Sequence, residues 1–554
     1  MTTNHDFRRG PVQTGMAVAM AVVLPLFGGC GGGGGGGGGG SSSSTVDFDT
    51  LSVQPAAACT MAGIGAATIT ADAAVSILDV STGSTGNGSS DRAYCLVKAR
   101  VGANVNIWVA LPSADWNGRL RAEGNGVYGG ASQLVVPADS VRQGFVGVKT
   151  DTGHAGTAKG PLPDFLDGSW GMDATGGPAT QLQTDFAHRS EYLMSVVGKQ
   201  VAKAFYGRDP VRSYWYGCST GGRQGLMMAQ RYPEAYDAIL AGAPAIHWDR
   251  FQAYQIWPQL AMKHEAGGPM SAAKRSLVTA RAVAACDADD GVTDGVIDDP
   301  RRCNYDPTND IEITRANCSD DTCLTPGEAS GVKKIWEGAT SASGRLLWPG
   351  IERGADLGAF SGTFPFPIPI EQARYWVYFD PTWDWNTLTY ANYETYFYDN
   401  ARMVGPTMAT DNPDLSAFKA RGGKIILWHG WSDQLIMPQG TVNYYERVRQ
   451  SVSGSDEFSR LYMVPGMAHC ATGSGVSEFG QVASGAVAAD PKTDIFRALM
   501  AWSEKGQAPT SITAARIENG STTRTRPLCP YPQVARYQGS GSTDDAANFS
   551  CVTR

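Results

Sequence analysis

Basic residues are in the minority in this 554-residue chain, where 45 Lys and Arg face 53 Asp and Glu and leave a net charge of −8. No basic stripe occurs, which argues against a nucleic-acid partner. The sequence also has no Cys-x-x-Cys pair and no internal repeat, which weakens the case for a zinc site or a repeat architecture. The hydrophobic share of 42% is normal for a globular protein and excludes wholesale disorder.

An apolar segment long enough to cross a bilayer is missing as well. The run Met16–Phe27 is shorter than the roughly 20 residues that a membrane span needs. It follows Arg8 and Arg9 and precedes small residues, which is typical of a secretory signal. The segment ends at Cys30 in a sequence that resembles a bacterial lipoprotein cleavage box, with ordinary signal-peptidase cleavage as the alternative. We therefore predict a signal peptide over residues 1–30 and lipidation of Cys30.

A tract of Gly and Ser follows the signal. Such a sequence has nothing to bury and behaves as a flexible coil. We interpret residues 31–45 as a linker between a lipid anchor and a folded body. The protein is then expected to be secreted and held at the bacterial cell envelope, in the periplasm or at the outer membrane, as a monomer that touches the membrane only through its anchor.

Cysteine usage fits an oxidising compartment. Setting Cys30 aside leaves ten cysteines, and an even number behind an export signal suggests five disulfides. Spacing alone does not fix the connectivity. Local pairs are plausible and leave one distant pair over: Cys59–Cys95, Cys286–Cys303, Cys318–Cys323 and Cys529–Cys551, with Cys218 and Cys470 remaining.

The chain divides by texture into two α/β stretches and an insertion. Residues 46–245 alternate strand-like and helix-like segments, and the pattern resumes over residues 406–554, which predicts a mostly parallel sheet covered by helices. Residues 246–405 are rich in Trp, Pro, Asp and Cys and have poor periodicity. We interpret them as a lid, or cap, inserted into the α/β domain; an independent domain on flexible linkers is the alternative.

The pentapeptide Gly-Cys-Ser-Thr-Gly at residues 217–221 fits the G-x-S-x-G pattern of a nucleophile elbow. A strand-like segment leads in and a helix-like segment leads out, so Ser219 would sit on a sharp turn with its hydroxyl exposed. The N–H of Thr220, at the start of the helix, would stabilise an oxyanion. This context predicts an α/β-hydrolase fold with a serine nucleophile. A chance match in a glycine-rich chain is the alternative.

A serine hydrolase also needs a base and an orienting acid, which follow the nucleophile in this fold class. Asp433 lies in the loop after a predicted strand and is the best acid. His469 and His429 are the candidate bases. Cys218 directly precedes Ser219, and Cys470 directly follows His469, so a disulfide between the two cysteines would hold nucleophile and base close together. This favours His469.

These residues resemble the tannase and feruloyl esterase family, whose members include a hydrolase of mono(2-hydroxyethyl) terephthalate. The resemblance covers nearly all of residues 50–554, and its most specific parts are GCSTGGRQGLMMAQRYPEAYDAILAGAPA, WHGWSDQLI, VPGMAHC and TRPLCPYPQVARY. It implies that Ser219, Asp433 and His469 form the catalytic triad beside a Cys218–Cys470 disulfide. It also places a second oxyanion donor, besides Thr220, at Asn125 or Gly126.

The resemblance further implies a structural Ca²⁺ site in the lid. The segment 286–296 is dense in acids, although it departs from the EF-hand pattern. Its spacing matches the family's calcium loop, which assigns side-chain and backbone ligands in turn: Asp287, Asp290 and Asp294 through carboxylates, and Val292 and Val296 through carbonyls. A solvated acidic turn is the alternative.

The family acts on aromatic esters, so a small aromatic ester is the expected substrate. Aromatic residues cluster at 375–385 of the lid, and some of them would wall a flat pocket. The terephthalate enzyme binds its substrate's carboxylate with a lid arginine, but the corresponding stretch here, Phe364–Pro369, contains none. We therefore favour a feruloyl-like ester. A galloyl or terephthaloyl ester, peptide cleavage, and an inert surface binding protein are the alternatives.

Overall fold

The computed structural model describes residues 51–554 except 66, 87, 89–90, 483–486 and 554. The predicted signal peptide, its Cys30 and the linker to residue 45 lie outside the described residues. Among the residues that are described, no helix combines the length and the apolarity that a bilayer crossing requires.

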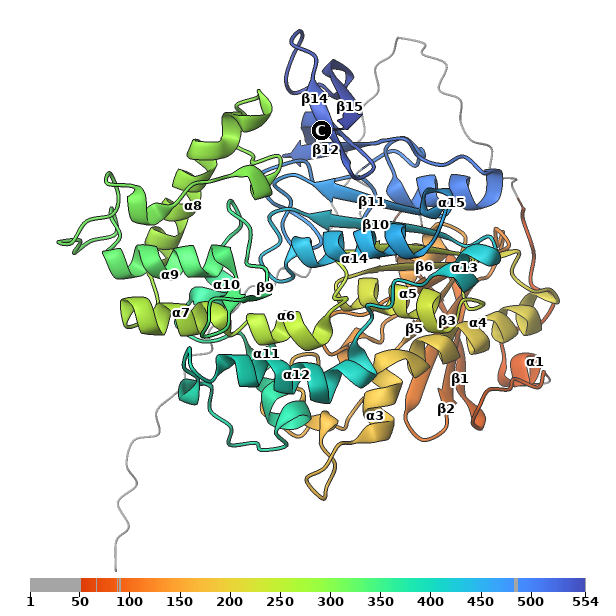
Figure 1. Ribbon diagram of the computed structural model, residues 1–554. Helices are drawn as coiled ribbons and strands as arrows, with labels where there is room; N and C mark the ends of the chain where they lie inside the picture. Colours follow the sequence, from red (N-terminus) through yellow and green to blue (C-terminus); the bar gives the residue numbers. More distant parts are fainter. Residues whose placement is uncertain (1–50, 66, 87, 89–90, 483–486, 554) are drawn as a thin grey trace, which may run out of the picture.

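A nine-stranded mixed sheet forms the centre of the described chain (Figure 1). Its antiparallel part pairs, in order, β1 (Val75–Ser84), β2 (Ala93–Val101), β3 (Val105–Pro112) and β5 (Val146–Thr150). Its parallel part continues from β5 through β4 (Arg119–Glu123), β6 (Arg212–Cys218), β7 (Ala238–Gly242), β10 (Lys424–Gly430) and β11 (Ser459–Val464). Parallel strands buried on both faces read as continuous apolar runs, and β7 and β10 do so.

Helices cover both faces of this sheet. Alternate residues of β10 point to opposite sides, because the side-chain period of a strand is two. Ile425 and Leu427 pack with one group of helices, namely α4 (Ser190–Tyr206), α5 (Thr220–Arg231) and α14 (Pro438–Ser451). Ile426 and Trp428 pack on the other face, against α15 (Ile495–Lys505). This three-layer arrangement is the predicted α/β-hydrolase architecture (Figure 1).

The predicted lid leaves the sheet after β7 and returns before β10. These two strands are parallel neighbours in register, so the insertion begins and ends beside the same part of the sheet. Its elements share an apolar core of their own with the loops around Tyr128 and Trp170. They are α6 (Trp248–Tyr254), α7 (Trp257–Ala266), α8 (Ala272–Cys286), α9 (Pro326–Glu337), β8 (Ala339–Thr340), β9 (Leu346–Trp348), α10 (Gly358–Ser361), α11 (Pro367–Gln372) and α12 (Tyr393–Met408).

Smaller elements complete the α/β part. Short helices accompany the longer ones: α1 (Met61–Gly65), α2 (Ala138–Arg142), α3 (Thr180–Thr184) and α13 (Ser416–Ala420). The C-terminal segment adds two antiparallel hairpins, β12 (Ile512–Glu518) with β13 (Ser521–Leu528) and β14 (Gln533–Tyr537) with β15 (Phe549–Thr553). β13 is in contact with β11, so the tail packs at the end of the sheet.

Candidate active site

Ser219 stands on the turn between β6 and α5. Its φ of 65° lies in the left-handed region, which costs energy for a residue with a side chain and is often found at functional sites. The turn is fixed on both sides, because the Ser219 N–H donates to Gly242 and its carbonyl accepts from Ala245 and Arg223. These contacts impose the strained conformation that a nucleophile elbow requires.

Glycines let the backbone close up around this turn. A Cβ at Gly124, in the loop after β4, would lie 2.5 Å from the Cα of Gly221, and one at Gly217 would lie 2.7 Å from the backbone of Gly221. The loop after β4 therefore approaches the first turn of α5 more closely than side chains would permit.

Asp433 and His469 extend from the loops after β10 and β11. His469 Nδ1 lies 2.7 Å from Asp433 Oδ2, and Asp433 is fully buried. Asp433 Oδ1 accepts the N–H groups of Leu435 and Ile436, which fixes the carboxylate. Because the neighbour of His469 Nδ1 is a pure acceptor, this nitrogen carries the proton and leaves Nε2 free to accept one.

His429, the alternative base, lies behind Asp433 and is completely buried. Its Nε2 is 3.0 Å from Asp433 Oδ2, and its Nδ1 is 2.9 Å from Thr441 Oγ1. Burial on its own raises the pKa of the Asp433 carboxyl, but attraction to His469 and the hydrogen bonds from His429 and His469 outweigh burial, so this pKa lies well below its usual range. His429 thus helps to keep Asp433 ionised.

A disulfide joins the nucleophile segment to the base segment. Cys218 and Cys470 are bonded with their Cα atoms 6.0 Å apart, across a sequence separation of 252 residues. Ser219 and His469, the adjacent residues, line the same cavity. The two residues that sequence reasoning joined through their neighbouring cysteines are therefore brought together in space.

The cavity at Ser219 is open to solvent, and about 330 Å³ of empty space, which includes part of that solvent, lies between its walls. Its walls come from the elbow, from α6, from the start of α11 and from the loop after β10: Val127, Ser219, Thr220, Ala245, Trp248, Phe251, Gln252, Gln255, Phe366, Ile368, Leu435, Ile436 and His469. None of the aromatic residues at 375–385 lines it. Trp376, for example, is buried against Tyr128 and Trp170. The expectation that this cluster walls the pocket is corrected: Trp248, Phe251 and Phe366 do so.

The loop after β4 contains Asn125 and Gly126, where the resemblance places a second oxyanion donor. The Asn125 N–H donates to Gln224 Oε1 at 2.9 Å, and the Gly126 N–H donates to Gln133 Oε1 at 2.7 Å, so both are already engaged. The next residue, Val127, lines the cavity and has a φ of 46°, which is a rare strain for a β-branched residue. Sequence reasoning did not single out Val127, because its side chain carries no group that marks a functional residue.

Thr220 is held against this loop. It begins α5, and its hydroxyl donates to the Val127 carbonyl at 2.7 Å. The first N–H groups of a helix have no partner within the helix and carry a partial positive charge. Thr220 therefore joins the start of α5 to the loop at Val127, and both residues line the cavity with Ser219.

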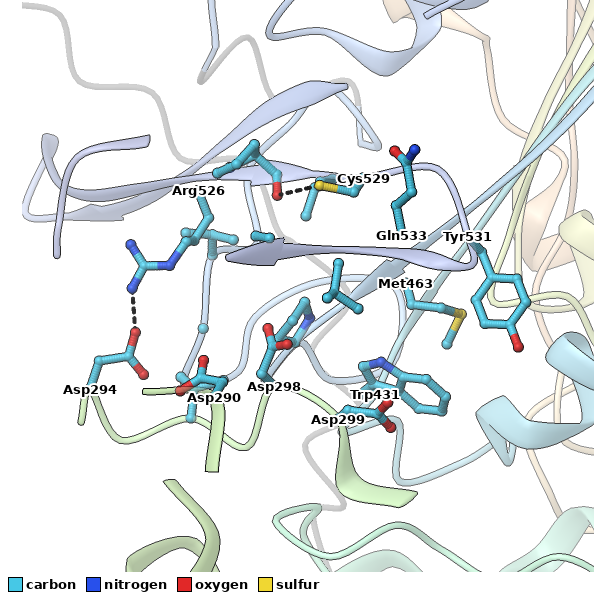
Figure 2. Close-up of a pocket in the computed structure, with 18 of the residues that line it drawn as sticks. Asp290, Asp294, Asp298, Asp299, Trp431, Met463, Arg526, Cys529, Tyr531 and Gln533 are labelled. Carbon is cyan, nitrogen blue, oxygen red and sulfur yellow. Dashed lines mark hydrogen bonds and ion pairs between the residues drawn. The ribbon is translucent and has the colours of Figure 1, made fainter. Parts of the chain in front are cut away.

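The acidic segment expected to bind calcium lies at the surface of the lid, facing the C-terminal hairpins (Figure 2). Asp287 accepts the N–H groups of three loop residues, 294 to 296, and Asp290 accepts the Val292 N–H. Asp294 is paired with Arg526 at 2.5 Å and with Arg524 at 3.3 Å.

Two of the expected carboxylates, Asp290 and Asp294, line a cavity together with Val296, whereas Asp287 does not. No group of three or more His, Cys, Asp or Glu side chains in the described residues is arranged to hold a metal ion. The assignment of calcium to this loop, through these carboxylates and the two valine carbonyls, therefore stays a prediction that rests on the resemblance.

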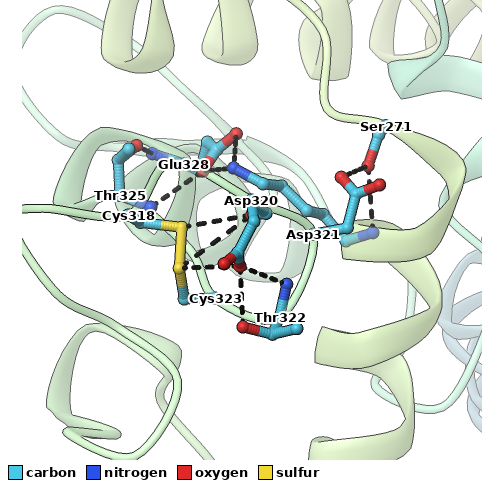
Figure 3. The surroundings of a disulfide bond; sticks show 9 residues. Ser271, Cys318, Asp320, Asp321, Thr322, Cys323, Thr325 and Glu328 are labelled. Carbon is cyan, nitrogen blue, oxygen red and sulfur yellow. Dashed lines mark hydrogen bonds and ion pairs between the residues drawn. A yellow bond between two sulfur atoms is a disulfide. The ribbon is translucent and has the colours of Figure 1, made fainter.

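The other four disulfides join Cys59–Cys95, Cys286–Cys303, Cys318–Cys323 and Cys529–Cys551. Cys318–Cys323 closes a short loop just before α9 (Figure 3). That helix begins with a capping box in which Thr325 and Glu328 satisfy each other's backbone N–H groups. Two of these four cross-links, Cys286–Cys303 and Cys318–Cys323, lie in the lid, in a region with little regular structure.

Comparison with known proteins places this geometry in context. A model of the family described as tannase and feruloyl esterase matches residues 92–372 and 366–552. A protein of Arthroderma benhamiae named "Probable feruloyl esterase" is 34% identical over 463 residues, which cover 81% of this chain and 82% of the relative. An uncharacterized esterase of Xanthomonas campestris is 33% identical over 496 residues, covering 81% and 82%.

Solved structures with a similar fold include esterases of the same kind. The crystal structure of feruloyl esterase B from Aspergillus oryzae superposes with a TM-score of 0.77 at 28% identity, covering 87% of this chain and 98% of that one. The tannin acyl hydrolase of Aspergillus niger superposes with a TM-score of 0.76 at 23% identity, covering 90% and 95%, which is a likeness of fold.

Proposed function

Because this chain belongs to the tannase and feruloyl esterase family and is an ester hydrolase by that relationship, we propose that it is a serine carboxylesterase acting on aromatic esters. The observation that carries the proposal is the convergence of three segments. Ser219 on a strained elbow and His469 on a neighbouring loop line one cavity, and His469 is hydrogen-bonded to the buried Asp433.

The proposed reaction is acyl transfer through Ser219. Its Oγ attacks the ester carbonyl and gives its proton to Nε2 of His469, which returns the proton to the leaving alcohol. A water molecule, activated by the same nitrogen, then hydrolyses the acyl-enzyme. Asp433 holds the imidazole in the required tautomer and stabilises the imidazolium.

Backbone N–H groups are proposed to bind the oxyanion. Thr220 supplies one from the start of α5. We assign the other to Val127 rather than to Asn125 or Gly126, because the amides of those two residues are engaged by glutamine side chains. Donors fixed before the reaction contribute most to stabilising charge that develops in the transition state.

A feruloyl or related hydroxycinnamoyl ester is the proposed substrate. Aromatic walls from Trp248, Phe251 and Phe366 suit a flat acyl group. Two of the matched relatives carry the names "Probable feruloyl esterase" and "Probable feruloyl esterase B-2". Galloyl esters and mono(2-hydroxyethyl) terephthalate are the alternatives.

Export and anchoring are proposed from the N-terminal sequence. Residues 1–30 have the pattern of a signal peptide, and Cys30 stands where a lipoprotein is acylated. The esterase would then work at the cell envelope as a monomer.

The test compares wild type with Ser219→Ala on methyl ferulate, methyl gallate and mono(2-hydroxyethyl) terephthalate. Loss of the nucleophile is expected to lower kcat by roughly 10⁴-fold or more. The matched control is Ser195→Ala, which removes another buried hydroxyl, one that donates to the Ala235 carbonyl, and should leave kcat unchanged. Activity that survives in Ser219→Ala would contradict the proposed mechanism. If wild type hydrolyses none of the three esters, the alternative of an inert binding protein is favoured.

A further inference from the structure

The helix α6, together with Gln255 directly after it, presents one face to the cavity at Ser219. Trp248, Phe251, Gln252 and Gln255 all line it, and their spacing of i, i+3, i+4 and i+7 places them on a single stripe. Two of these four side chains are amides, on a wall that is otherwise aromatic.

The two amides are buried and incompletely paired. Gln252 is 1% exposed and Gln255 is 3% exposed, and the Oε1 atom of each has no hydrogen-bond partner. Gln255 uses its Nε2 to donate to the Leu435 carbonyl at 2.9 Å, which fixes its orientation. The indole Nε1 of Trp248 also lacks a partner. A buried acceptor without a donor costs free energy, so a ligand that brings a donor recovers it.

The rest of the cavity does not compensate for a charge. No lysine or arginine is found among the described residues that line it. An acyl group with a free carboxylate would bury that charge beside two amide acceptors. A phenolic hydroxyl, in contrast, is neutral, donates one hydrogen bond to an amide oxygen and accepts one from an N–H such as the indole's.

We infer that Gln252 and Gln255 form the polar end of the acyl pocket and select neutral acyl groups that carry a phenolic hydroxyl. This inference rests on the proposed esterase function and adds to it the chemistry that the pocket recognises. Unpaired burial alone does not mark a ligand site, since Gln372 in α11 also has an unpartnered Oε1; what distinguishes Gln252 and Gln255 is that they line the cavity of the nucleophile.

The experiment uses a pair of esters of the same shape, methyl 4-hydroxycinnamate and methyl 4-methylcinnamate. Wild type is expected to prefer methyl 4-hydroxycinnamate by roughly tenfold or more in kcat/KM, because the 4-methyl group of the other ester leaves the amide oxygens unpaired. Gln252→Met and Gln255→Met keep the side-chain volume and remove the acceptor. They should bring the ratio of the two kcat/KM values toward one while retaining activity on methyl 4-methylcinnamate. The matched control Gln372→Met removes a buried amide outside the cavity and should keep the wild-type ratio.

The outcomes distinguish a failure of this inference from a failure of the proposed esterase function. A ratio near one in wild type, or a wild-type ratio retained in both cavity variants, overturns the inference while leaving the esterase intact. Wild type that cleaves neither ester overturns both. Since the wild-type ratio needs no variant, the inference stays falsifiable if a methionine variant does not fold.

Discussion

Breaking the Cys218–Cys470 bond is expected to damage both stability and turnover. Each cross-link restricts the unfolded chain, and the restriction grows with the length of the loop it closes. For a sequence separation of 252 residues the chain-entropy relation gives about 5.5 kcal/mol. Spread over the unfolding entropy of about 500 residues, this corresponds to a Tm lower by about 5 °C in a Cys218→Ala, Cys470→Ala double variant.

The effect on turnover is the specific part of this prediction. The bond lies one residue from both Ser219 and His469, so its loss should let them drift apart, and a misplacement of about 1 Å costs on the order of 10²-fold in kcat. The double variant Cys529→Ala, Cys551→Ala is the control, because that bond closes a separation of 22 residues in the C-terminal hairpins, for about 3.4 kcal/mol.

Calorimetry and ester hydrolysis are measured on both double variants. The control should melt earlier than wild type and keep its kcat. If the Cys218, Cys470 variant also keeps the wild-type kcat, or if both variants lose kcat equally, the reasoning that this bond positions the nucleophile against its base is refuted.

Three further predictions concern the buried carboxyl in α4, the acidic loop and the N-terminus. Burial raises the pKa of Glu191 to about 8, above its ordinary 4.5. The contribution of this carboxyl to the free energy of unfolding is therefore fully present below pH 4.5 and falls as the pH rises to about 8. Glu191→Gln should flatten that fall in Tm across pH 4.5–8, and an unchanged slope would contradict the assignment. If the lid binds Ca²⁺ as the resemblance implies, chelation should lower the Tm, and Asp287→Asn should abolish this effect of chelation. A Tm that does not change on chelation would contradict the predicted calcium site. Cys30→Ser should eliminate incorporation of labelled palmitate in a bacterial host, and persistent labelling would contradict anchoring at Cys30.

Local sequence patterns were enough to predict the site residues that are marked by their neighbours in the chain. The elbow could be predicted because a glycine-flanked Ser219 between strand-like and helix-like segments is a local signal. The choice of His469 over His429 followed from the flanking cysteines, although both histidines contact Asp433 in the structure. Sequence alone left the function of His429 open, because its burial behind the acid depends on α14 packing over β10.

Features set by distant contacts could not be predicted. The sequence does not distinguish an aromatic residue that walls a cavity from one buried in a core, and Trp376 belongs to the core. Which amides in the loop after β4 are engaged depends on Gln133 and Gln224, whose side chains accept the N–H groups of Gly126 and Asn125. The pairing of Asp294 with Arg526 joins residues far apart in the chain, and no spacing rule indicates it.

Covalent labelling of the intact esterase tests the central claim most directly. Incubation with a fluorophosphonate and peptide mass spectrometry should find one modification, on Ser219, in step with loss of ester hydrolysis. The His469→Ala variant should label far more slowly, because no base then removes the hydroxyl proton. A label on another residue, or full inhibition with Ser219 unmodified, would contradict the account.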